Sequence, residues 1–423
     1  MLDIKFIKEN IQEVKDVCIN KNLDLDIDKL IVLDEQKRQL QVKVETIRAK
    51  RNEINERMKN KRDDDLINQS KILKEELEKL EKEFEDTKKE FEDIYFRVPN
   101  IISKNTPRNP NPEGNVIIKT VGKIPKFNFK IKDHVQLGKD LDIIDFDKGT
   151  KAHGSRGYYL KNEGAMLHFA LMNYAFSKII NKGFVPISTP SIVKEFTFFG
   201  SGFFPYLKDE VFKISNDNDS YLAGTSELSL LAYYSDEVID KKQLPIKVCA
   251  FSPCYRSEVG SYGKDTKGLY RVNEFMKVEQ VVICENSITE SEKYFKEMFS
   301  ISEEILKELQ LPYHVLNLCS GDMGAGKYYA VDIETYMPSR DGYGETHSCS
   351  NLTDWQTRRS NIRFKDELGN KNYCYALNNT VIASPRILIA ILENYQQKDG
   401  SVKIPKVLLK YMPKKISIIK SKK

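Results

Sequence analysis

Apolar residues recur with a seven-residue rhythm in the first hundred positions, in two runs separated by the charged stretch 61–65. The first run comprises Leu33, Leu40, Ile47 and Ile54, with Val44 and Met58 in the interleaved register, and the second comprises Leu73, Leu77, Leu80, Phe84, Thr87, Phe91, Ile94 and Val98. This spacing is typical of a coiled-coil seam. Two such runs joined by a short polar break predict an antiparallel helical hairpin. At about 1.5 Å per residue, arms of roughly 30 residues would project on the order of 45 Å.

Charge divides unevenly between the two predicted helices. The outgoing helix carries the basic residues Lys37, Arg38, Lys43, Arg48, Lys50, Arg51, Arg57, Lys59, Lys61 and Arg62, and the returning helix carries the acidic residues Glu75, Glu76, Glu78, Glu81, Glu83, Glu85, Asp86 and Glu90. Ion pairs between the helices would absorb part of this charge. The pattern leaves two interpretations open, a solvated charged surface or a basic ridge that follows a phosphate backbone.

The pattern changes after Val98, where a proline-rich segment at 105–117 cannot continue a helix. We therefore predict an N-terminal helical domain over 1–104, with its arm at about 30–98, a linker over 105–117, and a second domain over 118–423. Beyond the linker, helical patterns at 164–180 and 290–309 alternate with β-branched segments around Val185, Val248, Val281, Val331 and Tyr373. This mixture predicts an α+β domain on a largely antiparallel sheet.

Composition adds limits to this picture. A chain of 423 residues is long enough for two domains. The net charge of +5 is small for a chain with 30% charged residues, so attraction to an anionic partner must come from local clusters. The 7 cysteines lack paired spacing, which argues against a zinc ribbon or a disulfide framework. Since no apolar run suits a signal peptide or a membrane span, we expect a cytoplasmic protein.

The segment 251–279 carries the most informative chemistry. Two strand-like stretches flank the glycine-rich basic loop 260–268. If strand alternation holds, Arg256 and Glu258 share a face, and Arg271, Phe275 and Glu279 line one side of the partner strand. Such a surface offers a guanidinium for a phosphate, an aromatic ring for a base and a carboxylate for a donor. An exposed sheet face with alternating charges would have the same pattern.

Three stretches together resemble the signature motifs of class II aminoacyl-tRNA synthetases in their seryl form. They are Gly183-Phe-Val-Pro-Ile-Ser-Thr-Pro190, the run from Tyr255-Arg-Ser-Glu258 to Arg271-Val-Asn-Glu-Phe275, and Ala376-Leu-Asn-Asn-Thr380 continuing to Arg386. The resemblance implies an antiparallel-sheet catalytic domain behind a tRNA-binding coiled-coil hairpin. It also implies a homodimer through the first motif. The implied reaction is ATP-dependent activation of L-serine to seryl-adenylate and transfer to tRNA(Ser), without a covalent enzyme intermediate and with tRNA(Sec) as a further candidate substrate.

The same resemblance implies roles for individual residues. Arg256, Glu345 and Arg386 would be catalytic, with Arg256 contacting the serine carboxylate and the ATP α-phosphate and Arg386 the γ-phosphate. The ATP site would comprise Arg256, Ser257, Glu258, Val272, Phe275, Glu345, Thr346, His347, Ser348 and Arg386. The L-serine site would comprise Thr225, Ser226, Glu227, Arg256, Glu279, Asn378 and Thr380. Glu345 and Ser348 would bind Mg²⁺ with the ATP phosphates, since a hard cation prefers oxygen ligands.

Some of these residues also have simpler interpretations. The sequence Thr225-Ser-Glu227 before an apolar run is typical of a helix N-terminus, and both roles can hold together. His347 beside a presumed metal site is better read as an orienting hydrogen-bond partner than as a base. Val259, Asn379, Val381 and Pro385 depart from residues common at these motif positions, which bears on pocket shape rather than on reaction type.

Two rival functions remain. A ligase that passes an activated amino acid to a carrier protein would share the catalytic motifs but lack the long basic hairpin. A nucleic-acid-binding protein on an inactive synthetase fold would be expected to have lost Arg256, Glu279, Glu345 or Arg386, and all of these are present.

Overall fold

The computed structural model describes residues 1–60, 64–216, 219–259 and 268–421. The chain forms two compact units, Met1–Pro99 and Asn100–Lys423. Each unit has its own helices and core, and each is described by itself below.

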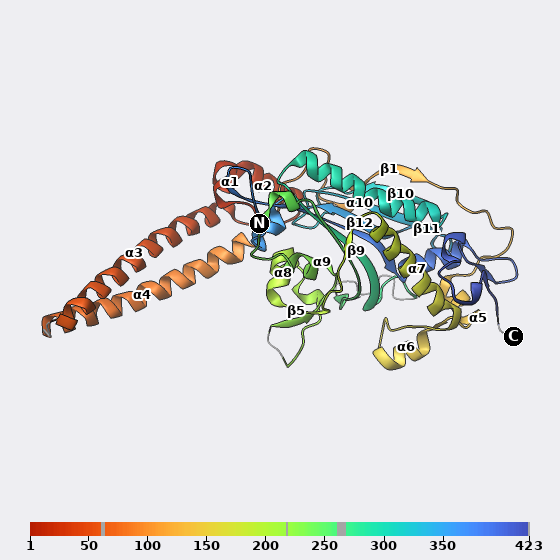
Figure 1. Cartoon of the computed structure of the whole chain (residues 1–423), viewed down its shortest axis with the longest axis horizontal. Helices are drawn as coiled ribbons and strands as arrows, with labels where there is room; N and C mark the ends of the chain where they lie inside the picture. Colours follow the sequence, from red (N-terminus) through yellow and green to blue (C-terminus); the bar gives the residue numbers. More distant parts are fainter. Residues whose placement is uncertain (61–63, 217–218, 260–267, 422–423) are drawn as a thin grey trace. The chain divides into compact units, whose positions relative to one another are not determined.

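All the regular secondary structure in the described part of the first unit is helical. Two short helices, α1 (Ile4–Glu9) and α2 (Ile11–Asn20), precede the long helices α3 (Ile27–Asn60) and α4 (Asp64–Tyr95). Helices α3 and α4 lie side by side as a hairpin (Figure 1). The predicted seam is confirmed because Val44, Ile47 and Leu77 are buried together, with Leu80 and Phe84 packed against them. The predicted polar break includes residues 61–63, which lie outside the described residues.

Ion pairs join the two arms of this hairpin. Arg48 bonds Glu81 at 2.7 Å between Nη2 and Oε1, and the Lys29 ammonium lies 3.3 Å from the Glu90 carboxylate. All four side chains are at least 38% exposed, so these pairs contribute little to stability. Lys43 and Lys50 on α3 are exposed and contribute to the basic charge of the outgoing arm.

An eight-stranded sheet forms the centre of the second unit. Its order is β1-β10-β11-β12-β15-β9-β8-β4, and every pair is antiparallel except β4 with β8. The strands span Val116–Val121 (β1), Val185–Pro186 (β4), Ile246–Tyr255 (β8), Glu274–Cys284 (β9), Tyr313–Asn317 (β10), Tyr329–Met337 (β11), Gly342–Asn351 (β12) and Tyr375–Ser384 (β15). The predicted antiparallel α+β architecture is therefore confirmed.

The two faces of this sheet carry different layers. Helices α7 (Asn162–Asn181), α10 (Ile288–Glu308) and α12 (Arg386–Asn394) bury one face in the main core (Figure 1). On β9, Val278 and Val282 point into that core, whereas Val281 and Ile283 join a smaller core with helix α9 (Glu227–Ala232). Because side chains alternate along a strand, Phe275, Lys277 and Glu279 lie on the α9 side.

Smaller elements complete the second unit. They are α5 (His134–Asp140), β2 (Ile144–Asp145), α6 (Phe146–His153), β3 (Tyr159–Leu160), β5 (Ile192–Lys194), α8 (Glu195–Ser201), β6 (Ser220–Leu222), β7 (Val238–Asp240), α11 (Trp355–Arg359), β13 (Arg363–Lys365), β14 (Lys371–Tyr373), β16 (Val402–Lys403) and β17 (Ile418–Ile419). The proline-rich segment packs on this unit, since Pro107 and Asn109 carbonyls accept from the Ser320 and Gly321 amides at 2.9 and 2.8 Å. Over the described ranges, every helix is too short or too polar to cross a bilayer.

Candidate active site

A polar cavity of about 340 Å³ opens where β9, β12 and β15 meet the start of α12. Most of the predicted ATP-site residues gather around it. The lining includes Arg256, Glu258, Val272, Phe275, Glu345, Thr346, His347, Ser348 and Arg386, together with Glu210, Tyr270 and Arg271. The cavity thus brings three arginines and three acidic residues to one place.

Arg386 is held in this cavity by backbone carbonyls and by a carboxylate. Its Nε donates to the Tyr270 carbonyl at 3.0 Å, and its Nη1 donates to the Glu345 carbonyl at 3.0 Å. The same Nη1 lies 3.3 Å from the Glu345 carboxylate. Burial disfavours the charged guanidinium, but Glu345, Tyr270 and Glu258 together outweigh this effect and raise the pKa of Arg386. The group is therefore a fixed positive charge in a defined orientation.

Arg256 and Phe275 face each other across the cavity floor. The Arg256 guanidinium lies 5.4 Å from the centre of the Phe275 ring, and its Nε donates to the Gly224 carbonyl at 3.4 Å. The Arg256 backbone is fixed by Asn273, whose carbonyl accepts from the Arg256 amide at 2.9 Å. An aromatic plate and a guanidinium thus lie within reach of one ligand.

The predicted pairing of Arg256 and Glu258 on one strand face is wrong. Strand β8 ends at Tyr255, and Glu258 has a φ of 55°, so strand alternation does not apply to it. The Glu258 carboxylate instead accepts from Arg271 Nη1 at 2.9 Å, and Arg156 Nη1 lies 3.9 Å away. The prediction that Arg271 lines the partner strand with Phe275 and Glu279 is also wrong, because β9 begins at Glu274. The glycine-rich loop lies outside the described residues from 260 to 267.

Strand β12 supplies a row of polar groups to the cavity. Glu345 is half exposed, and Ser348 accepts from the Lys327 ammonium at 3.3 Å. Thr346 and His347 are buried, with Thr346 Oγ1 2.8 Å from His347 Nδ1. Burial lowers the pKa of His347 to about 3, so its imidazole is neutral and does not act as a charged group.

A second cavity of about 230 Å³ adjoins the first and shares Arg256, Lys277, Ser348 and Thr380 with it. It gathers the predicted serine-site residues Thr225, Glu227, Glu279, Asn378 and Thr380, together with Gly202, Gly326, Trp355 and Gln356. The two cavities therefore meet at a common boundary. A small ligand in one would contact a larger ligand in the other.

Glu227 is a buried carboxyl group with two amide partners. Its Oε1 accepts from Gln356 Nε2 at 2.6 Å and from Asn378 Nδ2 at 2.7 Å. Burial, reinforced by the nearby Glu279 charge, raises the pKa of Glu227 to about 7. The predicted local role of Thr225 also holds, since its Oγ1 accepts from the Glu227 amide at 3.2 Å at the start of α9.

Lys277 lines both cavities, although it is not among the predicted site residues. Its ammonium lies 2.7 Å from Glu279 Oε2 and donates to Thr225 Oγ1 at 2.6 Å, with both charged side chains buried. Thr380 Oγ1 adds a bond to the same Glu279 oxygen at 3.3 Å. The signal was available, because Lys277 lies between Phe275 and Glu279 in the alternation of one strand. Gln356 and Trp355 gave no comparable signal in the sequence.

Two predicted site residues turn away from the cavities. Ser257 Oγ donates to the Asp209 carbonyl at 2.8 Å, and Ser226 is buried at the N-terminus of α9. Two departures from the family pattern also point elsewhere. Asn379 donates to Ser302 Oγ at 2.8 Å on the α10 side, and Val381 is in the main core. Pro385 lines the first cavity directly before Arg386.

Comparison with known families gives the class of this fold and site. Residues 211–395 match the tRNA synthetase class II core domain (G, H, P, S and T), and residues 1–102 match the seryl-tRNA synthetase N-terminal domain. The second unit is thus the catalytic core of a class II aminoacyl-tRNA synthetase, as its motifs predicted.

Full-length relatives narrow this class. A serine–tRNA ligase of Borreliella afzelii is 46% identical, covering 97% of this chain and 98% of its own. One from Treponema denticola is 40% identical over the same shares. The crystal structure of seryl-tRNA synthetase from Pyrococcus horikoshii complexed with ATP has a TM-score of 0.87 at 36% identity, covering 100% of both chains. The chain belongs to the seryl-tRNA synthetase family.

Proposed function

We infer that this chain activates L-serine with ATP to give seryl-adenylate and pyrophosphate, and then transfers the seryl group to tRNA(Ser). The observation that carries this inference is the pair of adjoining cavities. The larger one presents arginines and an aromatic ring, and the smaller one presents buried carboxylates and hydroxyls. A nucleotide in the first and a small hydroxylated amino acid in the second would meet at Arg256. The full-length similarity to serine–tRNA ligases supports the same reaction.

Arg256 lines both cavities and is suited to bring the reacting atoms together. Its guanidinium would contact the serine carboxylate and the ATP α-phosphate. The carboxylate oxygen then attacks the α-phosphorus, and the bond to pyrophosphate breaks. Holding the two reactants in the correct orientation lowers the entropic cost of bringing them together from solution. Arg386, already fixed by Tyr270 and Glu345, would bind the γ-phosphate.

The adenine would stack on Phe275 in the larger cavity. Glu258 and Val272 line the same cavity, and the Glu258 side chain and the Val272 backbone would define the edge of the base. Base–aromatic stacking is typically worth about 1–3 kcal/mol. Thr346, His347 and Ser348 on β12 would contact the nucleotide from elsewhere in the same lining. For Ser257 and Ser226 we propose only a supporting role, since neither side chain lines a cavity.

Glu345 and Ser348 offer the oxygen atoms that a Mg²⁺ ion prefers. A third oxygen is close at hand, because Asp332 pairs with Ser348 across β11 and β12, and its Oδ1 is buried without a hydrogen-bond partner among the described residues. This donor set fits the ion. When bound with ATP, Mg²⁺ would neutralise phosphate charge; Glu345 and Ser348 would hold it.

Selectivity for serine would come from the smaller cavity. The Glu227 carboxylate would bind the substrate ammonium, and Asn378 holds that carboxylate in place through a hydrogen bond. Glu279 and Thr380, which bond each other, would bind the substrate hydroxyl. When alanine replaces serine, the buried acceptor that would bind the serine hydroxyl is left without a partner. Alanine is therefore rejected more strongly than the loss of a single contact would predict. The Trp355 ring, packed against Gly202 and Gly326, narrows the pocket against larger side chains.

The hairpin of the first unit is the proposed tRNA-binding element. Its outgoing helix α3 exposes Lys43, Arg48 and Lys50, whereas α4 is rich in exposed acids. Contact with the phosphate backbone would therefore be one-sided and sensitive to salt. This division assigns amino-acid activation to the second unit and tRNA capture to the first.

We further propose a homodimer through the first motif. Phe169 on α7 and Val185 on the edge strand β4 are 57% and 59% exposed, and a partner at this edge of the sheet would cover Val185. Light scattering of the purified chain tests the dimer, and a monomer at assay concentration would contradict it.

The seven cysteines are buried free thiols, which suits the reducing cytoplasm that we propose as the location of the reaction.

Charging of a tRNA(Ser) transcript with labelled serine tests the whole proposal. We expect ATP-dependent attachment of serine to the terminal adenosine. Serine activation without attachment to tRNA, combined with acylation of a carrier protein, would instead support the carrier-protein ligase.

A further inference from the structure

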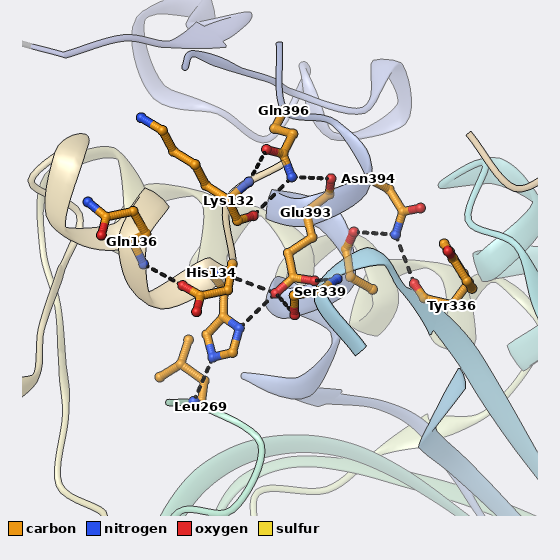
Figure 2. A network of polar contacts seen from close by, with 11 residues as sticks. Lys132, His134, Gln136, Leu269, Tyr336, Ser339, Glu393, Asn394 and Gln396 are labelled. Atoms are coloured by element: carbon orange, nitrogen blue, oxygen red, sulfur yellow. Dashed lines mark hydrogen bonds and ion pairs between the residues drawn. The ribbon is translucent and has the colours of Figure 1, made fainter. Parts of the chain in front are cut away.

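Figure 2 shows a network of polar contacts that joins α5 to α12 and includes buried residues to which no role has been given above. At its centre is Glu393, the side chain of which is fully buried near the end of α12. Its Oε1 accepts from the His134 backbone amide at 3.0 Å and lies 2.8 Å from His134 Nδ1. Ser339 completes the set, donating from its amide to Oε2 and from Oγ to Oε1, each at 2.9 Å.

The same network fastens the start of α5 to the end of α12. Gln396 forms two bonds with the Lys132 backbone, accepting from its amide at 2.9 Å and donating to its carbonyl at 3.1 Å. The His134 amide would otherwise be one of the unsatisfied donors at a helix N-terminus. These backbone contacts therefore fix the position of His134 independently of its side-chain contacts.

The other nitrogen of His134 reaches the ATP-site wall. The Leu269 amide donates to His134 Nε2 at 3.1 Å. Because the Glu393 carboxylate only accepts, Nδ1 must carry the imidazole proton and Nε2 must be the acceptor. The geometry therefore assigns a neutral Nδ1–H imidazole. We call the chain of contacts from Glu393 through His134 to the Leu269 amide the His134 bridge.

Gly268 makes room for the His134 bridge. Its φ is 85°, and a Cβ at this position would lie 2.1 Å from His134 Nε2. Any side chain here would push the ring away from the Leu269 amide. A glycine is thus required both for the backbone conformation and for the close approach of the imidazole.

The His134 bridge ends one residue before the backbone group that orients Arg386. The Tyr270 carbonyl accepts from Arg386 Nε, and the Tyr270 ring centre lies 4.4 Å from the Arg386 guanidinium. Leu269 and Tyr270 both line the larger cavity. Two residues of α12 therefore hold Leu269 and Tyr270 in place. Arg386, in the first turn of the helix, bonds to the Tyr270 carbonyl directly. Glu393, in its last turn, acts on the Leu269 amide through His134.

We propose that His134 is a positioning residue for adenylation, which holds Leu269 and Tyr270 so that Arg386 meets the triphosphate of the nucleotide. This inference rests on the proposed role of Arg386. It assigns to His134 an effect on ATP but none on serine, since the bridge does not contact the smaller cavity. A purely structural histidine would affect both substrates alike, through the amount of folded protein.

Two substitutions in the full-length chain separate the two halves of the bridge. His134→Asn can keep a donor near Glu393 but removes the acceptor for the Leu269 amide, whereas His134→Gln can present an amide oxygen near the position of Nε2. In serine-dependent ATP–pyrophosphate exchange we expect His134→Asn to lower kcat/KM for ATP by roughly tenfold, the effect of one lost hydrogen bond, with an unchanged KM for serine. His134→Gln should recover most of the loss. Lys139→Gln, on the exposed face of the same helix, is the matched control and should match the wild type.

A double-mutant cycle tests the route through Arg386. In an Arg386→Ala background, His134→Asn should have little further effect, because the group that it positions is gone. If His134→Asn does not fold, Gly268→Ala disturbs the same contact from the other side and should show the same ATP-selective loss. Unchanged ATP kinetics, equal loss in the ATP and serine parameters, or equal damage in the Asn and Gln variants would overturn the proposal. Wild-type protein without exchange activity would instead refute the proposed function itself.

Discussion

Lys277 and Glu279 form a buried ion pair, with 2.7 Å between Nζ and Oε2, two residues apart on the same face of β9. Less than a tenth of either side chain is exposed. Such a pair is costly to desolvate, and removing one partner leaves an uncompensated charge. The pair lies between Thr225 and Thr380, both of which line the smaller cavity.

Lys277→Met should therefore damage both stability and serine use. Leaving Glu279 buried without its partner is expected to cost about 3–5 kcal/mol of unfolding free energy. A Lys277→Met/Glu279→Leu double variant should regain much of that stability, since apolar groups of similar size replace the pair. It should remain inactive with serine. Denaturant unfolding together with exchange kinetics checks both points, and full activity in either variant would remove the pair from the serine site.

Serine binding should depend on pH through Glu227. Its folded pKa of about 7 lies above the usual value, so the carboxyl group becomes protonated as pH falls below 7. The proposed contact with the substrate ammonium needs the charged form of Glu227. We therefore expect the serine association constant, measured by calorimetry, to fall by about tenfold per pH unit below 7 and to level off above it. Glu227→Gln should bind weakly with no such slope, and an unaltered slope in that variant would place the titrating group elsewhere.

The same raised pKa has a consequence for folding. Between the unfolded value near 4.5 and the folded value of about 7, the folded chain binds more protons at Glu227 than the unfolded chain does. The contribution of this group to stability therefore falls as pH rises through that window. The Glu227→Gln variant lacks this contribution, so its Tm should fall less between pH 5 and pH 8 than the Tm of the wild type.

Glu345 should set the Mg²⁺ requirement of exchange. Glu345→Gln removes a charged oxygen ligand and the partner of Arg386, so the Mg²⁺ concentration for half-maximal rate should rise severalfold. Glu367→Gln makes the same chemical change at a position that is 84% exposed, and should behave like the wild type. An unaltered Mg²⁺ requirement in Glu345→Gln would remove this carboxylate from the metal site.

The arm should serve the tRNA step alone. Replacing residues 33–98 by a short linker should leave serine-dependent exchange largely intact and abolish tRNA charging. Equal loss of both activities would contradict the division of labour between the two units.

A finer test uses charge on the two arms of the hairpin. Lys43→Gln/Lys50→Gln on α3 should raise KM for tRNA and reduce the salt slope, because each lost phosphate contact lowers that slope by about one. Lys74→Gln/Lys82→Gln on α4 removes the same charge from the acidic arm and is the control. Equal effects from both pairs would contradict one-sided binding.

Much of this fold could be predicted from the sequence because its signals are local. Heptad spacing fixed the seam through Val44, Ile47 and Leu77, and period-two alternation together with the motifs identified β8 and β9. The alternation failed at Glu258, where a positive φ turns the chain and Arg271 becomes the partner.

The remaining site features depend on long-range contacts. Gln356 reaches Glu227 from 129 positions away, and His134 reaches Leu269 from 135 positions away. The sequence around Gln356 and around His134 contains no motif or periodicity that indicates these contacts. Lys277 is the exception, because the alternation of β9 already placed it beside Glu279.

Pyrophosphate exchange with each proteinogenic amino acid tests the central claim most directly. The wild-type chain should exchange pyrophosphate into ATP with serine, and alanine, glycine and threonine should give rates near the background. Glu279→Ala should raise the serine concentration needed for half-maximal exchange steeply. No exchange with serine, or exchange with another amino acid at a comparable rate, would contradict the assignment of serine as the substrate.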